Sequence, residues 1–360
     1  MGFFDRLGFR NISGAVLGVD IGASSLKIVQ VAQRNERSTL ETYGELSIGA
    51  YEGKEVGKVL AVPEERITAM LKDLVKEAEA HATRVAIAIP LRYSFVTTIQ
   101  LPELAPNEFD SAVKFEARKY VPLPIDDVVL DFERIAISEE ERAGLAGKVP
   151  VLIAASQKEV RDRYSRVLKS GGFSEEQMEI EVFSTTRSVI GRERSTTMIL
   201  DIGAATSKCI IAEHGSVRSA YGVDKGGQQL TLTLSQSMSV DFASAEKVKR
   251  EHGIRDLPEN HEQREALLPV LDGIFEEGER MRTFWRRKTN RPVERIIVTG
   301  GGSLLPGIVE HASEYYGTPV YLGNPFSMLE YPTVMEGVAK DIGPVFSVAV
   351  GAALKGVRGR

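Results

Sequence analysis

Two short segments of this chain carry the residue types that could hold a phosphate group. The first reads GVDIGASSLKIV over residues 18–29, and the second reads ILDIGAATSKCI over residues 199–210. In each, a glycine allows a tight turn that brings several backbone N–H groups close to one anion. In each, an aspartate before the glycine suits a hydrated Mg²⁺, and in the first segment Lys27 suits a phosphate. The aspartates could also be turn residues that bond to their own backbone.

The two segments are related by an offset of 181 residues, and this similarity predicts a duplicated domain. They share five residues, which pair as Asp20/Asp201, Ile21/Ile202, Gly22/Gly203, Ala23/Ala204 and Lys27/Lys208. Apolar and β-branched flanks predict that each copy is a strand, a glycine turn and a second strand. Two such hairpins that face each other across a cleft could grip a polyphosphate from both sides. Added hydroxyl donors would be Ser24, Ser25, Thr206 and Ser207.

A run of glycines follows an apolar strand at residues 293–299. It comprises Gly300, Gly301 and Gly302 and is followed by Ser303. A strand, a glycine turn and a helix form a general seat for a phosphate or a nucleotide. The run is not GxGxxG, because Leu305 occupies the last glycine position, and the chain contains no GxxxxGK[ST]. The sequence therefore disfavours Rossmann and P-loop folds, and a purely structural turn is the alternative.

Two further pieces lie between the second hairpin and this turn. The pair Gly226 and Gly227 opens a predicted helix, and Glu246 and Lys249 share one face of another. By themselves, both could be plain features of solvated helices.

The remaining sequence predicts the elements that position these residues. Residues 63–80 have the periodicity of an amphipathic helix, and a strand follows at 84–90. Residues 91–172 predict an inserted α+β subdomain. We expect its strands and helices at 93–101, 106–120, 128–135, 149–155 and 158–169, with a charged loop at 138–148. The later sequence is mostly helical over 225–290 and ends in a small-residue helix over 345–355.

The composition is that of an ordinary globular protein, with 42% hydrophobic and 26% charged residues. The net charge of −5 gives no bias towards nucleic acid. The single cysteine, Cys209, fits a reducing cytosol. No apolar run reaches the ~18 residues that span a bilayer, so we expect a soluble cytoplasmic protein. Phe3, Phe4 and Leu7 could contact a membrane or a partner, or pack against their own domain.

The segment 280–295 holds seven Arg and Lys residues around the single tryptophan, Trp285. Such a run could bind nucleic acid or an acidic partner. A helix with an acidic start and a basic end is also favoured by its dipole. We expect this second explanation and no nucleic-acid partner.

The order of the motifs resembles the actin/Hsp70/FtsA superfamily. It runs VDIGASSLK, LDIGAATSK, KGGQQLT, AEKVK, VTGGGSLLPG and SVAVGAAL. Within that superfamily, KFEARKYVPLPIDDVVLDFERI at 114–135 resembles the PilM family of type IV pilus assembly proteins. The resemblance implies an α/β fold of the actin-like ATPase type, with two duplicated lobes around a nucleotide cleft and an inserted α+β subdomain of the SHS2/FtsA type. The implied divisions are a first lobe at 1–90, the insertion at 91–172, a connecting segment at 173–194, a second lobe at 195–338 and a C-terminal helix at 339–360.

The resemblance also implies ATP and Mg²⁺ as cofactors. Asp20 and Asp201 would hold the metal, and Glu246 and Lys249 would reach the ribose. The phosphates would be held by Asp20, Gly22, Ala23, Ser24, Ser25, Lys27, Gly203, Ala204, Ala205 and Thr206. The glycine pair Gly226 and Gly227 belongs to the same motif order, and Gly300, Gly301, Gly302 and Ser303 would hold the α-phosphate and the adenine edge.

Catalysis in the superfamily uses an acid or a glutamine near residues 178–184. Glu181 is the candidate there, and a buried or surface strand glutamate without a catalytic role is the alternative. Ala205 stands where a hydroxyl residue would favour hydrolysis. We therefore expect at most a slow ATPase.

The PilM resemblance implies a cytoplasmic scaffold at the inner face of the cytoplasmic membrane. Its implied partner is the N-terminal cytoplasmic peptide of a PilN-like membrane protein, with coupling to pilus motor ATPases. Two alternatives stay open. The first is an FtsA-like cell-division protein. The second is a small-molecule kinase on the same fold, which would need a substrate pocket and an aspartate general base.

Overall fold

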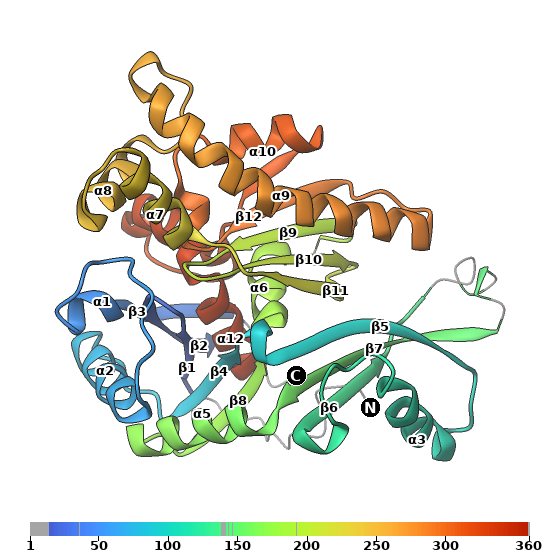
Figure 1. Ribbon diagram of the computed structural model, residues 1–360. Coiled ribbons are helices and arrows are strands. Elements are labelled where there is room, and N and C mark those ends of the chain that lie inside the picture. Colours follow the sequence, from blue (N-terminus) through green and yellow to red (C-terminus); the bar gives the residue numbers. More distant parts are fainter. Residues whose placement is uncertain are drawn as a thin grey trace.

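The structure is a computed structural model that describes residues 14–358 except 36, 138–141, 143, 146 and 192. The apolar N-terminal residues Phe3, Phe4 and Leu7, and most of the loop expected at 138–148, lie outside the described residues. The chain forms two lobes and a smaller insertion (Figure 1). In this view the first lobe lies at the lower left, the second lobe above it, and the insertion at the lower right.

The first lobe is built on a five-stranded sheet in the order β3-β2-β1-β4-β8. β1 is antiparallel to β2 and parallel to β4, and β4 is parallel to β8. Its strands are β1 (Val16–Ile21), β2 (Ser25–Arg34), β3 (Arg37–Ser47), β4 (Arg84–Ile89) and β8 (Glu175–Ile180). β1, β2 and β4 are buried over nearly their whole length because helices cover the sheet.

The second lobe repeats this topology strand for strand, in the order β11-β10-β9-β12-β13. β9 is antiparallel to β10 and parallel to β12, as β1 is to β2 and β4. Its strands are β9 (Thr197–Ile202), β10 (Ser207–Glu213), β11 (Ser216–Val223), β12 (Arg295–Thr299) and β13 (Val320–Leu322). The register also repeats, with Asp20 opposite Lys27 and Asp201 opposite Lys208. The predicted duplication is confirmed.

Two helices join the lobes at the centre of the molecule (Figure 1). α6 (Glu181–Ile190) carries the chain from β8 to β9, and α12 (Ser347–Arg358) returns it from the second lobe to pack on β1, β2 and β4. The remaining helices are α1 (Ile48–Tyr51), α2 (Glu64–Glu77), α3 (Pro106–Ala117), α5 (Lys158–Gly171), α7 (Gly227–Ser237), α8 (Phe242–His252), α9 (His261–Thr289), α10 (Ile308–Tyr316) and α11 (Glu336–Ile342).

The helix expected at 63–80 is α2, and the sequence explains both its start and its buried face. Pro63 precedes it in extended conformation, and Glu64 and Glu65 occupy the first turn, where the helix dipole favours acids. Met70, Leu71 and Leu74 are spaced on one face and are buried against the first sheet.

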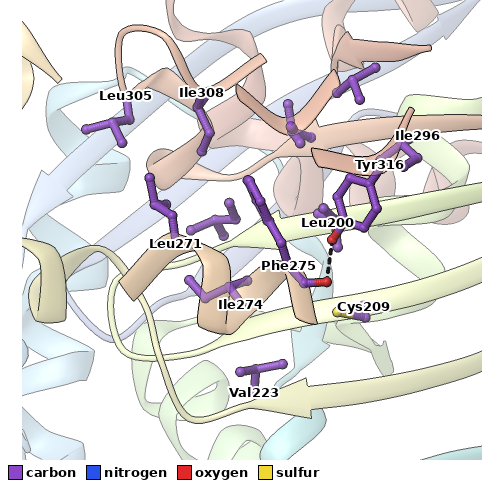
Figure 2. Packing of buried hydrophobic residues seen from close by; sticks show 14 of the residues in the cluster. Leu200, Cys209, Val223, Leu271, Ile274, Phe275, Ile296, Leu305, Ile308 and Tyr316 are labelled. Carbon is purple, nitrogen blue, oxygen red and sulfur yellow. Dashed lines mark hydrogen bonds between the residues drawn. The ribbon is translucent and has the colours of Figure 1, made fainter. Parts of the chain in front are cut away.

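The second lobe has its own apolar core between its sheet and helices α7 to α10 (Figure 2). Phe275 on α9 is fully buried at its centre, and the Tyr316 hydroxyl donates a hydrogen bond of 2.8 Å to the Phe275 carbonyl. Cys209 lies in the same core, and burial raises the pKa of its thiol to about 12. It is therefore a structural strand residue.

The insertion is a three-stranded sheet covered by α3. The strand order is β5-β7-β6, from β5 (Ser94–Pro102), β6 (Val128–Arg134) and β7 (Lys148–Gln157). Phe109, Val113 and Ala117 of α3 pack on the sheet. The insertion also contacts the second lobe: the Thr98 hydroxyl donates a 2.6 Å hydrogen bond to the Arg218 carbonyl.

The helix expected at 158–169 belongs to the first lobe rather than to the insertion. It is α5, and its buried residues Tyr164, Val167 and Leu168 are part of the first-lobe core with α2. Arg166 on α5 also forms a 2.7 Å ion pair with Glu64 on α2. The range 91–172 expected for the insertion therefore includes a helix that packs on the first lobe. The sequence of an amphipathic helix shows that it has an apolar face but does not show which sheet that face packs against.

One helical stretch of the described residues, Thr333–Val357, is long and apolar enough to cross a membrane by length and composition. The sequence alone predicts no such stretch. Its most apolar window is 67% buried inside the protein. It contains nearly all of α12, whose small residues Ala349, Ala352 and Ala353 are fully buried where this helix packs on the sheet of the first lobe.

Candidate functional site

A cavity of about 380 Å³ lies between the two lobes. Both hairpin turns line it, together with the turn after β12 and the first residues of α6 and α12. Of the predicted site residues, the cavity is lined by Asp20, Gly22, Ala23, Ser24, Ser25, Lys27, Glu181, Asp201, Gly203, Ala204, Ala205, Thr206, Gly227, Glu246, Lys249, Gly300, Gly301 and Gly302. The fold therefore brings together residues that are up to 282 positions apart in the sequence.

Three predicted residues do not line the cavity. Ser207 is buried, and its hydroxyl donates a 2.8 Å hydrogen bond to the Lys225 carbonyl. Gly226 packs its backbone against the carbonyl groups of Gly203 and Ala204. Ser303 is buried, and its hydroxyl donates a 2.7 Å hydrogen bond to the Gly300 carbonyl. Gly226 and Ser303 thereby stabilise the turns that line the cavity without lining it themselves.

The two hairpin turns have the same backbone geometry. The Gly22 amide donates a 3.0 Å hydrogen bond to the Ser25 carbonyl, and the Gly203 amide donates a 3.0 Å bond to the Thr206 carbonyl. The turns face the cavity from opposite lobes. This arrangement suits an elongated anion held at both sides by backbone and hydroxyl donors.

The turn after β12 requires glycine at its start. Gly300 has a φ of 80°, in the left-handed region, and a Cβ there would overlap the Asp201 carboxylate. Gly301 is open, because a Cβ at this position would meet nothing within 4 Å. The turn can therefore lie directly against a ligand.

Five charged side chains lie close together in the cavity, and we call this cluster the cavity floor: Asp20, Lys27, Glu181, Asp201 and Lys208. The two lysines come from matching positions in the two hairpins. Lys27 Nζ lies 2.9 Å from Ser25 Oγ and 3.7 Å from Asp20. Lys208 Nζ lies 3.0 Å from Glu181 and 3.3 Å from Asp201. Burial would lower the pKa of Lys208, but the charges of Asp201 and Glu181 outweigh it and raise that pKa, so this lysine stays protonated.

Glu181 is the first residue of α6 rather than a strand residue. One carboxylate oxygen accepts a 2.7 Å hydrogen bond from the Leu91 amide, and the other pairs with Lys208. Burial raises the pKa of Glu181, against the opposing charge of Lys208. Both oxygens are therefore engaged, and the carboxylate is not a free base in this state.

The pair Glu246 and Lys249 is inside the cavity, so the solvated-helix alternative is wrong for it. Glu246 is 6% exposed, and its carboxylate lies 2.6 Å from Lys249 Nζ and accepts hydrogen bonds from Thr231 and Arg250. Lys249 Nζ also donates to the Gly227 carbonyl at 3.2 Å. The two helices α7 and α8 thereby present a fixed polar edge.

A strap from the first lobe, residues 52–63 between α1 and α2, crosses to this polar edge. The Val59 amide donates a 2.6 Å hydrogen bond to Gln228 Oε1 on α7, and the backbone of Gly57 lies against the Glu246 carboxylate. Lys58 Nζ lies 5.8 Å from the centre of the Phe242 ring on α8. The strap therefore joins the lobes at one side of the cavity.

Six charged or polar residues that line the cavity carry no assignment from the sequence: Glu45, Arg92, Lys208, Gln228, Arg250 and Ser347. Lys208 was visible in the repeat, since it aligns with Lys27. Gln228 follows the glycine pair directly. Arg92 enters the cavity from the turn after β4, and no motif marks it.

Four of the seven basic residues in the segment 280–295 form ion pairs. Arg280 and Arg282 pair with Glu277 and Glu279 on α9, as expected for a solvated helix face. Arg291 pairs with Glu213 and Arg295 with Glu193.

The expected Mg²⁺ would need carboxylates that are free to face it or its waters. Lysines already oppose all three carboxylates on the floor, with Lys27 beside Asp20 and Lys208 beside Asp201 and Glu181. Among the described residues, no group of three or more His, Cys, Asp or Glu side chains is placed to hold a metal ion. The donor set present does not fit a resident divalent metal.

Two topologically identical lobes, two facing glycine hairpins and a cleft between them define the actin-like ATPase fold. Solved structures agree: MreB5 of Spiroplasma citri bound to AMPPNP superposes with a TM-score of 0.55 over 96% of each chain at 14% identity. The family model of the type IV pilus assembly protein PilM matches residues 18–357, and the chain belongs to this family.

Two further relatives cover almost the whole chain. The PilM-PilN type IV pilus biogenesis complex contains a chain that is 26% identical, with a TM-score of 0.80 and coverage of 97% of this chain and 99% of that chain. The cell division protein FtsA of Pseudomonas aeruginosa is 21% identical over 387 residues, which cover 95% of this chain and 89% of FtsA.

Proposed function

We propose that this protein is an ATP-binding scaffold of the type IV pilus assembly platform. The observation that carries the nucleotide is the pair of glycine hairpins that face one cavity, with lysines on its floor and Glu246 and Lys249 at its edge. The hairpins and the lysines suit phosphates, and the pair Glu246 and Lys249 suits the hydroxyl groups of a ribose. The phosphate, ribose and adenosine roles expected for the motif residues are part of this proposal.

Calorimetric titration with ATP tests the assignment of the cleft. Gly301→Leu should place a side chain where the protein leaves space, so that the fold is kept and ATP affinity falls by at least tenfold. Gly337→Leu is the matched control, because position 337 is equally open but lies outside the cavity. Equal ATP binding by the parent and Gly301→Leu would place the nucleotide elsewhere.

We further propose that the scaffold binds the N-terminal cytoplasmic peptide of a PilN-like membrane protein on the insertion and the adjoining first lobe. Family membership and the 26% identical chain of the PilM-PilN complex support this partner. The insertion sheet has the edge strands β5 and β6, and the same subdomain exposes Phe115 on α3 and Tyr120 just after it, by 65% and 46%. A small subdomain with strand edges and exposed aromatic residues suits an extended peptide.

Crosslinking of such a peptide to the ATP-loaded protein tests the docking surface. We expect contacts within residues 14–172 and simultaneous binding of peptide and ATP, because the cavity lies elsewhere. Phe115→Ala should weaken peptide binding, whereas Phe284→Ala, on an equally exposed phenylalanine of α9, should not. Contacts confined to residues 195–338 would contradict the proposal.

The proposal places the protein in the cytoplasm, at the inner face of the cytoplasmic membrane, peripheral to it and held there by the partner. Coupling to pilus motor ATPases is part of the same proposal. Fractionation with and without the PilN-like protein tests the placement, since membrane association should depend on that partner. Persistent association in its absence would require another anchor.

An FtsA-like role in cell division is the second candidate, and it is supported by the 21% identity to FtsA over 95% of the chain. Deletion separates the two, because a pilus scaffold should be needed for pili and an FtsA-like protein for septation. A small-molecule kinase would need an aspartate free to act as a base. Asp20 and Asp201, the aspartates lining the cavity, face lysines, which disfavours this candidate.

A further inference from the structure

Lys208 occupies the centre of the acidic group on the cavity floor. Its ammonium lies 3.0 Å from one oxygen of Glu181 and 3.3 Å from one oxygen of Asp201. Asp20, from the other lobe, also acts on it electrostatically. These are the carboxylates that a divalent metal would otherwise use.

The Lys208 ammonium lies beside these carboxylates in a largely buried position. Lys208 is the second residue of β10, paired with Asp201 on β9 and with Gly222 on β11, and its side chain is 11% exposed. A divalent cation bound to the same carboxylates would lie within a few ångströms of this positive charge, and like charges repel strongly where water is scarce.

The hairpin of the first lobe supplies a second ammonium in the same way. Lys27 stands opposite Asp20 as Lys208 stands opposite Asp201, so the pseudo-twofold relation of the lobes brings both lysines to one floor. The whole lining is balanced, with five carboxylates and five cations. They are Asp20, Glu45, Glu181, Asp201 and Glu246, and Lys27, Arg92, Lys208, Lys249 and Arg250.

A polyphosphate that enters this cavity meets cations already in place. Lysine is a compact point charge with rotatable donors, so each ammonium can turn from its carboxylate towards a phosphate oxygen without a change of the backbone. A metal is needed where carboxylates alone face the phosphates, because it bridges like charges. Here the ammonium groups do this.

Resting on the proposed binding of a nucleoside triphosphate, we propose that Lys208 is a built-in cation in place of a divalent metal, so that this cleft binds ATP with little dependence on Mg²⁺. Lys208 is a binding residue in this role. It touches the phosphates and also keeps Glu181 and Asp201 neutralised between ligands.

The test is the dissociation constant of ATP, measured by calorimetry with excess Mg²⁺ and, separately, with EDTA. The parent protein should show values within about threefold of each other. Loss of binding in EDTA, with tight binding in Mg²⁺, would overturn the inference while leaving the nucleotide cleft intact. No binding in either buffer would instead refute the proposed function.

Two variants of Lys208 sharpen the result. Lys208→Met leaves the two carboxylates of Glu181 and Asp201 without their cation, so ATP should bind at least tenfold more tightly with Mg²⁺ than with EDTA. Lys208→Arg keeps the charge and should remain independent of Mg²⁺. If Lys208→Met does not fold by circular dichroism, the parent measurement and Lys208→Arg still decide the question.

Lys27→Met is the matched control from the other hairpin. Lys27 pairs more loosely, at 3.7 Å from Asp20, and Lys208 still lies beside Glu181 and Asp201 in this variant. Its ATP affinity should fall by the same factor in both buffers. If ATP binding depends on Mg²⁺ in Lys27→Met and not in Lys208→Met, then Lys27 and not Lys208 replaces the metal, and the inference is overturned.

Discussion

Gly351 on α12 lies directly against the backbone of Ser184 on α6, so that a methyl group at position 351 would overlap the Ser184 carbonyl oxygen. These helices are the two that join the lobes. Arg187 on α6 donates a 2.8 Å hydrogen bond to the Gly351 carbonyl, and Lys355 on α12 lies 3.4 Å from Glu179 on β8. The contact between the two helices therefore tolerates no added atom.

Gly351→Ala should lower the free energy of unfolding by about 3 kcal/mol, because the clash is with backbone and both helices must shift. Gly337→Ala on α11 is the control, since a Cβ there meets nothing. It should change stability by less than about 1 kcal/mol. Urea denaturation measures both. A parent-like midpoint for Gly351→Ala would mean that the helices separate at little cost.

The buried carboxylate of Glu179 should make stability depend on acid pH. Burial would raise its pKa, but Arg187 and Lys355 outweigh burial and lower it from 4.5 to about 2. Because the folded pKa is depressed, the stabilisation is complete above about pH 5 and is lost as the pH falls from 4.5 towards 2. The shift corresponds to about 3 kcal/mol.

Urea denaturation of the parent and Glu179→Gln between pH 7 and pH 2.5 checks this. The variant should be less stable by about 3 kcal/mol at pH 7, since it leaves buried cations without their partner. The difference should shrink below pH 4.5. A difference that stays constant down to pH 2.5 would show that Glu179 titrates normally.

The strap should slow the release of a bound nucleotide. Gln228→Ala removes the hydrogen bond from the Val59 amide, worth about 1 kcal/mol, so release should become about fivefold faster. Stopped-flow release of a fluorescent ATP analogue measures the rate. The neighbouring exposed residue provides the control Gln229→Ala, which should release at the parent rate. Equal rates for all three proteins would mean that the strap does not retain the ligand.

Hydrolysis by the isolated protein should be at least a thousandfold below the ~10 s⁻¹ of a typical enzyme. Glu181 at the start of α6 has one oxygen on the Leu91 amide and the other on Lys208, and the charge of Lys208 opposes the uptake of a proton from water by this carboxylate. Phosphate release under saturating ATP measures the turnover. A rate near 10 s⁻¹ that is lost in Glu181→Gln would restore that glutamate as a general base.

The sequence by itself determined the duplication and most of the site. Asp20 and Asp201 sit in two copies of one pattern, and a glycine turn between apolar strands has few other conformations available. The pattern therefore predicted both hairpins, and the run that begins at Gly300 predicted the third turn. Local residue types are sufficient for such turns, because each is stabilised by contacts close in the sequence.

Tertiary structure alone decided what the charged residues do. No sequence pattern predicts a contact between Lys208 and Glu181, because they lie 27 positions apart in different elements. The packing of α6 beside β10 nevertheless makes them an ion pair. That contact changes the expected metal ligands and general base into partners of a lysine. Likewise α5 reads as the end of the insertion, but its apolar face packs on α2. Long-range packing selects among partners that local sequence leaves equivalent, and here it assigned the chemistry of the cleft.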